Sequence, residues 1–321
     1  MQDYRNTVLL ALPQPPKRAL MLNAAPLPGD ALRDVLTCEQ GFRPDYLALD
    51  RAGYTVAPHV DEAGFDTAFV PLHRARAVNE ANIARAHNAV AEGGSVIVAG
   101  PVKSSIKALR KWVAARTPVE ATVSKHHAVA FRFTRSGVDW PLPDLALDTD
   151  GYITQAGTFS ADRVDAGSRL LVRHFGPALR GCVADFGAGW GYLSAELLKV
   201  APDVGNMVLY EADHVALDCA RKNMSAWPDI AHFHWMDVAH EFERERFNHV
   251  IMNPPFHTAR AAEPELGQAF IAAAGRALMP GGSLLMVANR NLPYEVALSK
   301  HFKRWEQVAD EQGFKVVEAF V

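Results

Sequence analysis

The sequence has little of what marks secreted, membrane-bound or metal-binding proteins. Its three cysteines, Cys38, Cys182 and Cys219, are widely spaced and odd in number, so they provide neither a disulfide framework nor a pair at metal-ligand spacing. The start lacks the basic segment and apolar run of a signal peptide, and no apolar run approaches the ~18 residues of a membrane span. We therefore expect a cytoplasmic protein without a membrane segment or a bound metal.

The sequence also lacks a large excess of either sign of charge. The formal net charge is -3 and 21% of residues are charged, which excludes a disordered chain and gives no global argument for nucleic-acid binding. A local basic face stays compatible with such binding. The 321 residues, 49% of them hydrophobic, suffice for a sizeable core and suggest two domains. We expect the protein to be a monomer.

Short apolar runs alternate with helical patterns along the chain, which is typical of an α/β fold with mainly parallel, doubly wound sheets. Strands are predicted in the first half over 18–24, 46–50, 65–72 and 95–100, and in the second half over 182–187, 206–212, 247–253 and 282–289. Helices are predicted over 79–91 and 104–115, and after Gly191, His214 and Glu265. A proline-rich passage at 140–144 separates the halves.

The two halves follow one plan. Residues 65–77 run parallel to 247–261 in sequence, and a Gly-Gly pair precedes the last predicted strand of each half. Chance similarity explains the periodicity but not the shared proline–histidine–arginine order. We interpret the chain as two tandem Rossmann-like domains: residues 1–140, a degenerate copy without a glycine cluster that recognises the substrate, and residues 141–321, the catalytic domain.

A glycine loop, Asp185-Phe-Gly-Ala-Gly-Trp-Gly191, follows a predicted strand and opens a helix. Glycines let the backbone approach a ligand closely, and Glu211 ends the next strand about 20 residues on, where a carboxylate can bind ribose hydroxyls. The G-x-G-x-G spacing and the acidic Asp185 argue against a pyrophosphate at the helix N-terminus. They suit a sulfonium-bearing aminoacyl nucleoside, S-adenosylmethionine. The alternative is a turn that only packs a helix on a sheet.

Asp237 follows a third short strand, where it can accept a hydrogen bond from an adenine amino group while Val238 or Met236 packs the ring. The alternative for Asp237 is a helix N-cap, which the following residues favour almost equally.

The tetrapeptide Asn253-Pro254-Pro255-Phe256 sits at the carboxyl end of a predicted strand, where open α/β sheets place their active sites. The Asn253 side-chain oxygen and the Pro254 carbonyl can accept both N–H bonds of a planar amino group, and successive prolines keep these acceptors rigid. Phe256 offers a flat face for an extruded base. We predict these four residues as catalytic, although the tetrapeptide alone also suits a plain turn.

The second half resembles the ribosomal RNA small subunit methyltransferase C family, which makes N2-methylguanine in 16S rRNA within the small subunit. The matching segments are 158–160 with 165–168, 185–191, 253–257, 287–289 with 292–294, and 313–316. The resemblance implies a tandem pair of methyltransferase-like domains, the first without cofactor. It also implies cofactor contacts at Asp185, Gly187, Glu211 and Asp237, and target-base contacts at 253–256. The full set of predicted cofactor-binding residues is Asp185, Phe186, Gly187, Ala188, Gly189, Gly191, Glu211, Ala212, Asp237, Val238 and Asn253.

Other functions remain as alternatives. A nicotinamide-dependent oxidoreductase would need G-x-G-x-x-G spacing and a catalytic Tyr-Lys or His pair, and an RNA-binding pseudoenzyme would have lost the glycine loop or the tetrapeptide. Within methyltransferases, adenine N6 or a glutamine amide is the serious rival target, because the tetrapeptide suits any planar amino group.

A stripe of lysines and the pair Asp165 and Ser168 are weaker candidates for function. Lys103, Lys107 and Lys111 form a stripe on one predicted helix that suits rRNA phosphates, although a solvated helix face is the commoner cause. Asp165 and Ser168 either close over the cofactor or cap the helix beginning near Ser168.

Overall fold

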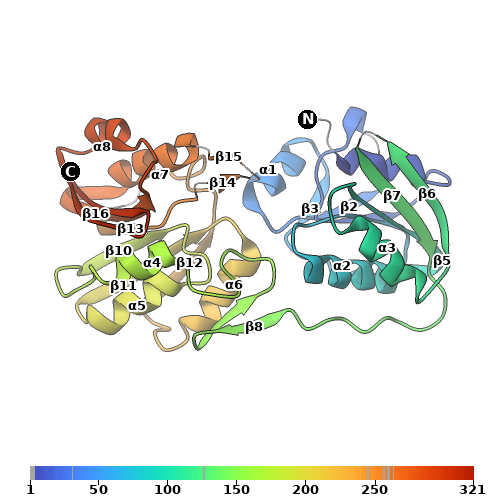
Figure 1. The fold of residues 1–321 in the computed structure, drawn as a ribbon, viewed down its shortest axis with the longest axis horizontal. Coiled ribbons are helices and arrows are strands. Elements are labelled where there is room, and N and C mark those ends of the chain that lie inside the picture. Colours follow the sequence, from blue (N-terminus) through green and yellow to red (C-terminus); the bar gives the residue numbers. More distant parts are fainter. Residues whose placement is uncertain are drawn as a thin grey trace. The chain divides into compact units, whose positions relative to one another are not determined.

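The computed structural model describes residues 4–30, 32–125, 127–243, 246–255, 257–258, 261–262 and 264–321, and the chain divides into two compact units, Met1–Leu145 and Ala146–Val321 (Figure 1). Trp140 ties the proline-rich passage to the first unit, because its indole stacks 4.3 Å from the His87 ring and 5.5 Å from the Phe133 ring. The division therefore falls between Leu145 and Ala146, a few residues beyond the boundary expected at 140.

Unit 1 is a seven-stranded sheet in the order β3-β2-β1-β4-β5-β7-β6. Its strands are β1 (Ala19–Leu22), β2 (Leu36–Glu39), β3 (Thr55–Ala57), β4 (Phe65–Pro71), β5 (Val90–Pro101), β6 (Val119–Lys125) and β7 (Ala128–Thr134). Its helices are η1 (Tyr4–Ala11), η2 (Pro28–Asp30), α1 (Arg43–Arg51), α2 (Arg76–Ala89) and α3 (Ile106–Ala114). Apolar residues of α2 and α3 pack on one face of the sheet, and those of η1 and α1 pack on the other.

Unit 2 repeats this order as β12-β11-β10-β13-β16-β18-β17. Its sheet strands are β10 (Gly181–Phe186), β11 (Val204–Glu211), β12 (Ala231–Trp235), β13 (Phe247–Met252), β16 (Leu278–Asn289), β17 (Arg304–Glu311) and β18 (Phe314–Phe320). Two hairpins are added, β8 (Ala146–Thr149) with β9 (Tyr152–Gln155), and β14 (His257–Thr258) with β15 (Ala261–Ala262). The helices are α4 (Ala166–Val172), α5 (Tyr192–Val200), α6 (His214–Asn223), α7 (Pro264–Ala277) and α8 (Glu295–His301).

Helices cover both faces of the unit 2 sheet. Side chains of α4, α5 and α6 form one core with Val183 and Leu209, while those of α7 and α8 form a second core with Phe186 and Tyr210. Strands β10 to β13 and β16 run parallel, and β18 and β17 close the edge antiparallel. The predicted doubly wound, mainly parallel α/β class is confirmed.

The two sheets agree down to one irregularity. In unit 1 the β4–β5 register jumps between the pairs Phe65↔Val90 and Thr67↔Ser95, and in unit 2 the β13–β16 register jumps between Phe247↔Leu278 and His249↔Ser283. Each jump falls where a Gly-Gly pair lies in the longer strand. Shared strand order and a shared register shift support the duplication predicted from the sequence.

One predicted strand is wrong. Residues 46–50 belong to helix α1, which begins with a proline in its first turn and buries only Leu49. Proline fixes the backbone dihedral that a first helical turn needs, so Pro44 was the signal for a helix start. The true second strand is the short β2, whose four residues are too few for a periodicity argument. None of the helices among the described residues is long and apolar enough to cross a membrane.

Candidate active site

The glycine loop and the Asn-Pro-Pro motif meet at one edge of the unit 2 sheet. Strands β10 and β13 pair in parallel up to Phe186↔Met252, so Gly187 and Asn253 leave adjacent strands side by side. A Cβ placed on Gly187 would lie 4.0 Å from Pro255 Cδ. Two motifs far apart in the sequence thus converge at the carboxyl ends of the strands, where such sheets bind ligands.

The glycine loop has backbone conformations that residues other than glycine adopt only with steric strain. Gly187, Gly189 and Gly191 all have positive φ, of 76°, 56° and 86°. The N–H groups of Gly187 and Ala188 both donate to the Tyr210 carbonyl, at 2.9 and 3.0 Å, which anchors the loop to strand β11. Gly191 then caps helix α5. The three glycines therefore serve the turn itself and not only the packing of a helix.

Glu211 closes the loop from the neighbouring strand. Its Oε2 accepts from Gly189 N at 2.7 Å and its Oε1 accepts from Asp213 N at 2.8 Å. Because each carboxylate oxygen has two lone pairs, both can still accept a hydroxyl hydrogen. The geometry suits a ligand with two adjacent hydroxyl groups.

Asp185 lies beneath the loop and is fully buried. Its Oδ2 accepts from the Ser194 hydroxyl at 2.7 Å, while its Oδ1 has no hydrogen-bond partner among the described residues. Burial raises the pKa of the Asp185 carboxyl to about 7, with a smaller upward contribution from Glu211, and burial likewise raises the pKa of Glu211 to about 7. A buried acidic side chain disfavours a phosphate close to it, and a contact between Asp185 and the ammonium group of a cofactor stays a prediction.

The raised pKa of Asp185 predicts a pH-dependent stability. Between pH ~4 and ~7 the folded chain holds a proton there that the unfolded chain has lost, so the free energy of unfolding falls as pH rises through this window. We expect the Asp185→Asn variant to gain stability relative to the wild type from about pH 5.5 to pH 8, measured by urea unfolding. The exposed Asp229→Asn is the control. A difference between Asp185→Asn and wild type that stays constant over this range would contradict the prediction.

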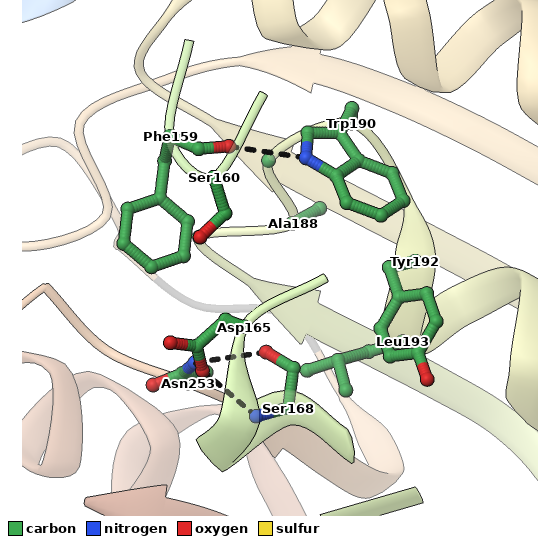
Figure 2. Close-up of a pocket in the computed structure, with 11 residues that line it drawn as sticks. Phe159, Ser160, Asp165, Ser168, Ala188, Trp190, Tyr192, Leu193 and Asn253 are labelled. Carbon is green, nitrogen blue, oxygen red and sulfur yellow. Dashed lines mark hydrogen bonds between the residues drawn. The ribbon is translucent and has the colours of Figure 1, made fainter. Parts of the chain in front are cut away.

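A small pocket opens between the glycine loop and the segment that precedes helix α4 (Figure 2). Its lining is made of Phe159, Ser160, Asp165, Ser168, Gly187, Ala188, Gly189, Trp190, Tyr192, Leu193 and Asn253. Trp190 is buried and donates from Nε1 to the Phe159 carbonyl at 3.1 Å, which ties the glycine loop to the opposite wall of the pocket. Phe159 itself is 51% exposed, an aromatic ring at the pocket that no motif chemistry had identified as functional. Its only sequence signal was membership of the segment 158–160.

Asn253 faces this pocket with its amide nitrogen already engaged. Nδ2 donates to Asp165 Oδ2 and to Ser168 Oγ, both at 2.9 Å (Figure 2). Asp165 Oδ2 also accepts from Ser168 N at 2.9 Å and so caps helix α4. The helix-cap interpretation of Asp165 is confirmed, while its closing over the cofactor stays a prediction.

The remaining predicted residues take varied positions. Pro254 is buried and Pro255 is exposed, whereas Phe256 lies outside the described residues. The Phe186 side chain and Val238 are buried in the core, and their contacts with a cofactor stay predictions. The Ala212 carbonyl accepts from Trp235 Nε1 at 2.9 Å.

Asp237 begins a turn, and no helix follows it among the described residues between β12 and β13, so the expected helix N-cap is wrong. Its Oδ1 accepts from Ala239 N at 3.1 Å, its Oδ2 contacts His240 Nδ1 at 2.7 Å, and its carbonyl accepts from Glu241 N. Both carboxylate oxygens thus have a partner within one turn. A contact between Asp237 and an adenine stays a prediction. No group of three or more potential metal ligands occurs in the described part of the chain.

The site defines a class. A glycine loop, a following acid and an Asn-Pro-Pro turn on a doubly wound sheet are the parts of a small-domain methyltransferase, and residues 151–318 match the family model "Methyltransferase small domain". The chain is 30% identical over 268 residues to a ribosomal RNA small subunit methyltransferase C of Shewanella pealeana, covering 78% of this chain and 76% of that protein. The relative from Klebsiella pneumoniae is 31% identical over 229 residues, covering 70% of this chain and 66% of that protein.

The chain belongs to the ribosomal RNA small subunit methyltransferase C family, as its motifs had indicated. A solved structure, the T. thermophilus 16S rRNA N2 methyltransferase in complex with AdoMet and guanosine, matches 99% of this chain and 92% of its own with a TM-score of 0.84 at 24% identity. That match extends the shared fold to both units.

Proposed function

We propose that this chain transfers the methyl group of S-adenosylmethionine to the exocyclic N2 amino group of a guanine in 16S rRNA of the small ribosomal subunit. The observation that carries the proposal is Asn253, held by its nitrogen beside the glycine loop so that its oxygen is left for a target amino group. Family membership supports the rRNA substrate, and the T. thermophilus neighbour was solved with AdoMet and guanosine.

The residues at the loop fit this cofactor. The unpaired Oδ1 of Asp185 suits its ammonium group, directly or through water, and the two oxygens of Glu211 suit its ribose hydroxyls. No group at the loop requires a phosphate. When bound, the cofactor supplies a methyl group activated by a sulfonium.

The chain's own residues supply orientation. An exocyclic amino group is a weak nucleophile because its lone pair is delocalised into the ring. Asn253 Oδ1 and the Pro254 carbonyl accept its two N–H bonds and favour a pyramidal nitrogen. Phe256 is proposed to support the base from below, as its type and position suggest. No general base is needed, since the proton leaves to solvent after transfer.

Unit 1 has the same strand order as unit 2 but different residues at the positions of the proposed site. By strand register, the counterparts of Asp185, Gly187, Glu211 and Asn253 are Met21, Asn23, Gln40 and Pro71. Gln40 Oε1 accepts from Phe42 N at 2.9 Å, just as Glu211 accepts from Asp213 N. Its amide nitrogen, however, donates to the Ala24 carbonyl at 2.6 Å. We propose that unit 1 binds no cofactor and serves substrate recognition.

Helix α3 offers unit 1 a phosphate-binding face. Between Pro101 and Val119 there is no acidic residue, and the exposed basic residues, named the basic face, are Lys103, Lys107, Arg110, Lys111 and Arg116. None of them pairs with a carboxylate in the part of the chain that the structure describes. Arg76, by contrast, is paired with Glu80 at 2.8 Å.

We predict that the combined Lys107→Ala and Lys111→Ala variant binds 16S rRNA more weakly and with a shallower salt dependence. Each lost phosphate contact should lower the slope of log K against log salt by about one. The control removes the same charge elsewhere, with Lys17→Ala and Lys303→Ala. Filter binding over a salt series measures both slopes, and an equal slope for the two double variants would contradict a role for the basic face.

The proposed reaction is tested by transfer of a tritiated methyl group from S-adenosylmethionine to small subunits, naked 16S rRNA, DNA and protein. Digestion of labelled RNA should yield N2-methylguanosine. Label recovered as N6-methyladenosine, or in a protein amide, would overturn the guanine assignment. In a separate arm the chain alone is treated with EDTA and freed of it before the RNA is added, and a loss of activity would then contradict the expectation that the enzyme needs no metal.

A further inference from the structure

Asp165 does more than cap a helix. A cap requires only one acceptor for the Ser168 N–H, and Asp213 caps helix α6 in this way by accepting from Val215 N and Ala216 N. Asp165 Oδ2 additionally receives the Asn253 Nδ2 donor at 2.9 Å, from a residue 88 positions away in the sequence. One oxygen thus joins the start of α4 to the end of β13.

The residues around Asp165 Oδ2 leave little free space beside it. A Cβ on Gly167 would lie 3.0 Å from Asp165 Oδ2 and 2.9 Å from a ring carbon of Phe314, so a side chain there would press on the carboxylate. Ser168, whose own N–H is capped, adds its Oγ as the second acceptor for Asn253 Nδ2 at 2.9 Å. Two acceptors from one helical turn therefore converge on a single amide nitrogen.

This arrangement decides which way the Asn253 amide faces. A carboxylate has no hydrogen to donate, so only the amide nitrogen of Asn253 can face Asp165 Oδ2. The amide oxygen must then point to the opposite side of the planar group, away from α4 (Figure 2). Without Asp165, the amide could turn over and present N–H groups to a target amino group, which has only donors to offer there.

We propose that Asp165, assisted by Ser168, is a positioning residue that fixes the Asn253 amide with its oxygen toward the target amino group. The proposal rests on the methyl-transfer function proposed above. Asp165 and Ser168 touch neither the reacting nitrogen nor the methyl group in this role. They act through Asn253.

The decisive variant is Asp165→Ser, because serine is a good N-cap but its shorter side chain does not reach Asn253. We expect kcat to fall by about 10- to 100-fold, since misplacing an acceptor by an ångström has effects of that size. The melting temperature and the Kd for S-adenosylmethionine should stay near wild type. Unchanged kcat, or a loss confined to cofactor affinity, would overturn the proposal.

A conservative variant gives a rescue test. In Asp165→Asn the amide oxygen can still accept from both Ser168 N and Asn253 Nδ2, so the helix cap and the contact to Asn253 are both kept. We expect Asp165→Asn to keep a kcat about tenfold above that of Asp165→Ser, because the orientation of the Asn253 amide is retained. A kcat as low in Asp165→Asn as in Asp165→Ser would count against the amide-orienting role.

A readout without turnover separates this proposal from the function itself. The side-chain amide protons of Asn253, assigned in NMR spectra by their loss in Asn253→Ala, should exchange slowly with solvent in the wild type and faster in Asp165→Ser. Equal exchange rates in the wild type and in Asp165→Ser would refute the role of Asp165 in holding the Asn253 amide. Slow exchange in a wild-type chain that methylates no guanine would support the contact between Asp165 and Asn253 and would refute the proposed substrate.

Discussion

Replacing Asn253 with alanine should lower kcat for methyl transfer by about 10²–10³-fold, which is the usual cost of removing one preorganised hydrogen-bonding group at a reacting centre. The loss falls on kcat because Asn253 Oδ1 is proposed to accept from the nitrogen as it becomes pyramidal. Its contact with bound cofactor, also predicted from the sequence, is expected to contribute little. Single-turnover transfer and calorimetric titration with S-adenosylmethionine measure the two effects separately.

The matched control for this variant lies on the same strand. Asn248, at the other end of β13, accepts from Cys182 N at 2.8 Å through its Oδ1. Asn248→Ala should cost about 1 kcal/mol of stability, as a lost hydrogen bond does, and leave kcat unchanged. If Asn253→Ala instead raised the Kd for the cofactor as much as it lowered kcat, Asn253 would be a cofactor ligand and not an acceptor for the target.

The second large effect is expected at Glu211. Removing its carboxylate in Glu211→Ala takes away two charge-assisted hydrogen bonds to the proposed ribose hydroxyls, each worth about 1.5–3 kcal/mol, so the Kd for S-adenosylmethionine should rise by about 100-fold or more. The variant also leaves Gly189 N without its acceptor. Isothermal titration calorimetry measures the change.

Gln40→Ala provides the control, because Gln40 is the register counterpart of Glu211 in unit 1 and makes the matching contact to the N–H two residues ahead. It should leave the cofactor Kd unchanged. A rise with Gln40→Ala as large as with Glu211→Ala would mean either that unit 1 also binds the cofactor or that the loss at Glu211 reflects a loosened turn.

Much of this site could be predicted because its parts are dictated by local backbone demands. Three glycines at G-x-G-x-G spacing require a tight loop, and two prolines after an asparagine require a rigid strand end. Parallel pairing of β10 with β13 then brings Gly187 and Asn253 together without further information. The doubly wound order follows from the same alternation of apolar runs and helical patterns.

The parts that could not be predicted depend on contacts distant in sequence or on competition between local signals. Nothing near Asp165 reveals that Asn253 lies 2.9 Å away, and nothing near Phe159 reveals that a tryptophan holds its carbonyl. At Asp237 the cap and ligand readings use the same residue type, and the structure shows both of its oxygens in a turn. At 46–50, a short apolar run predicted a strand, but helix α1 with Pro44 in its first turn covers these residues.

The matching register shift in β5 and β16 has a cost during folding. Two sheets with one strand order and one irregularity can exchange equivalent strands, and tandem repeats of one fold are known to misassemble in this way. Pro71 stands in unit 1 where Asn253 stands in unit 2, and the edges of the two sheets differ in charge and length. We expect the divergence of the first copy to keep each nascent sheet from accepting the other's strands.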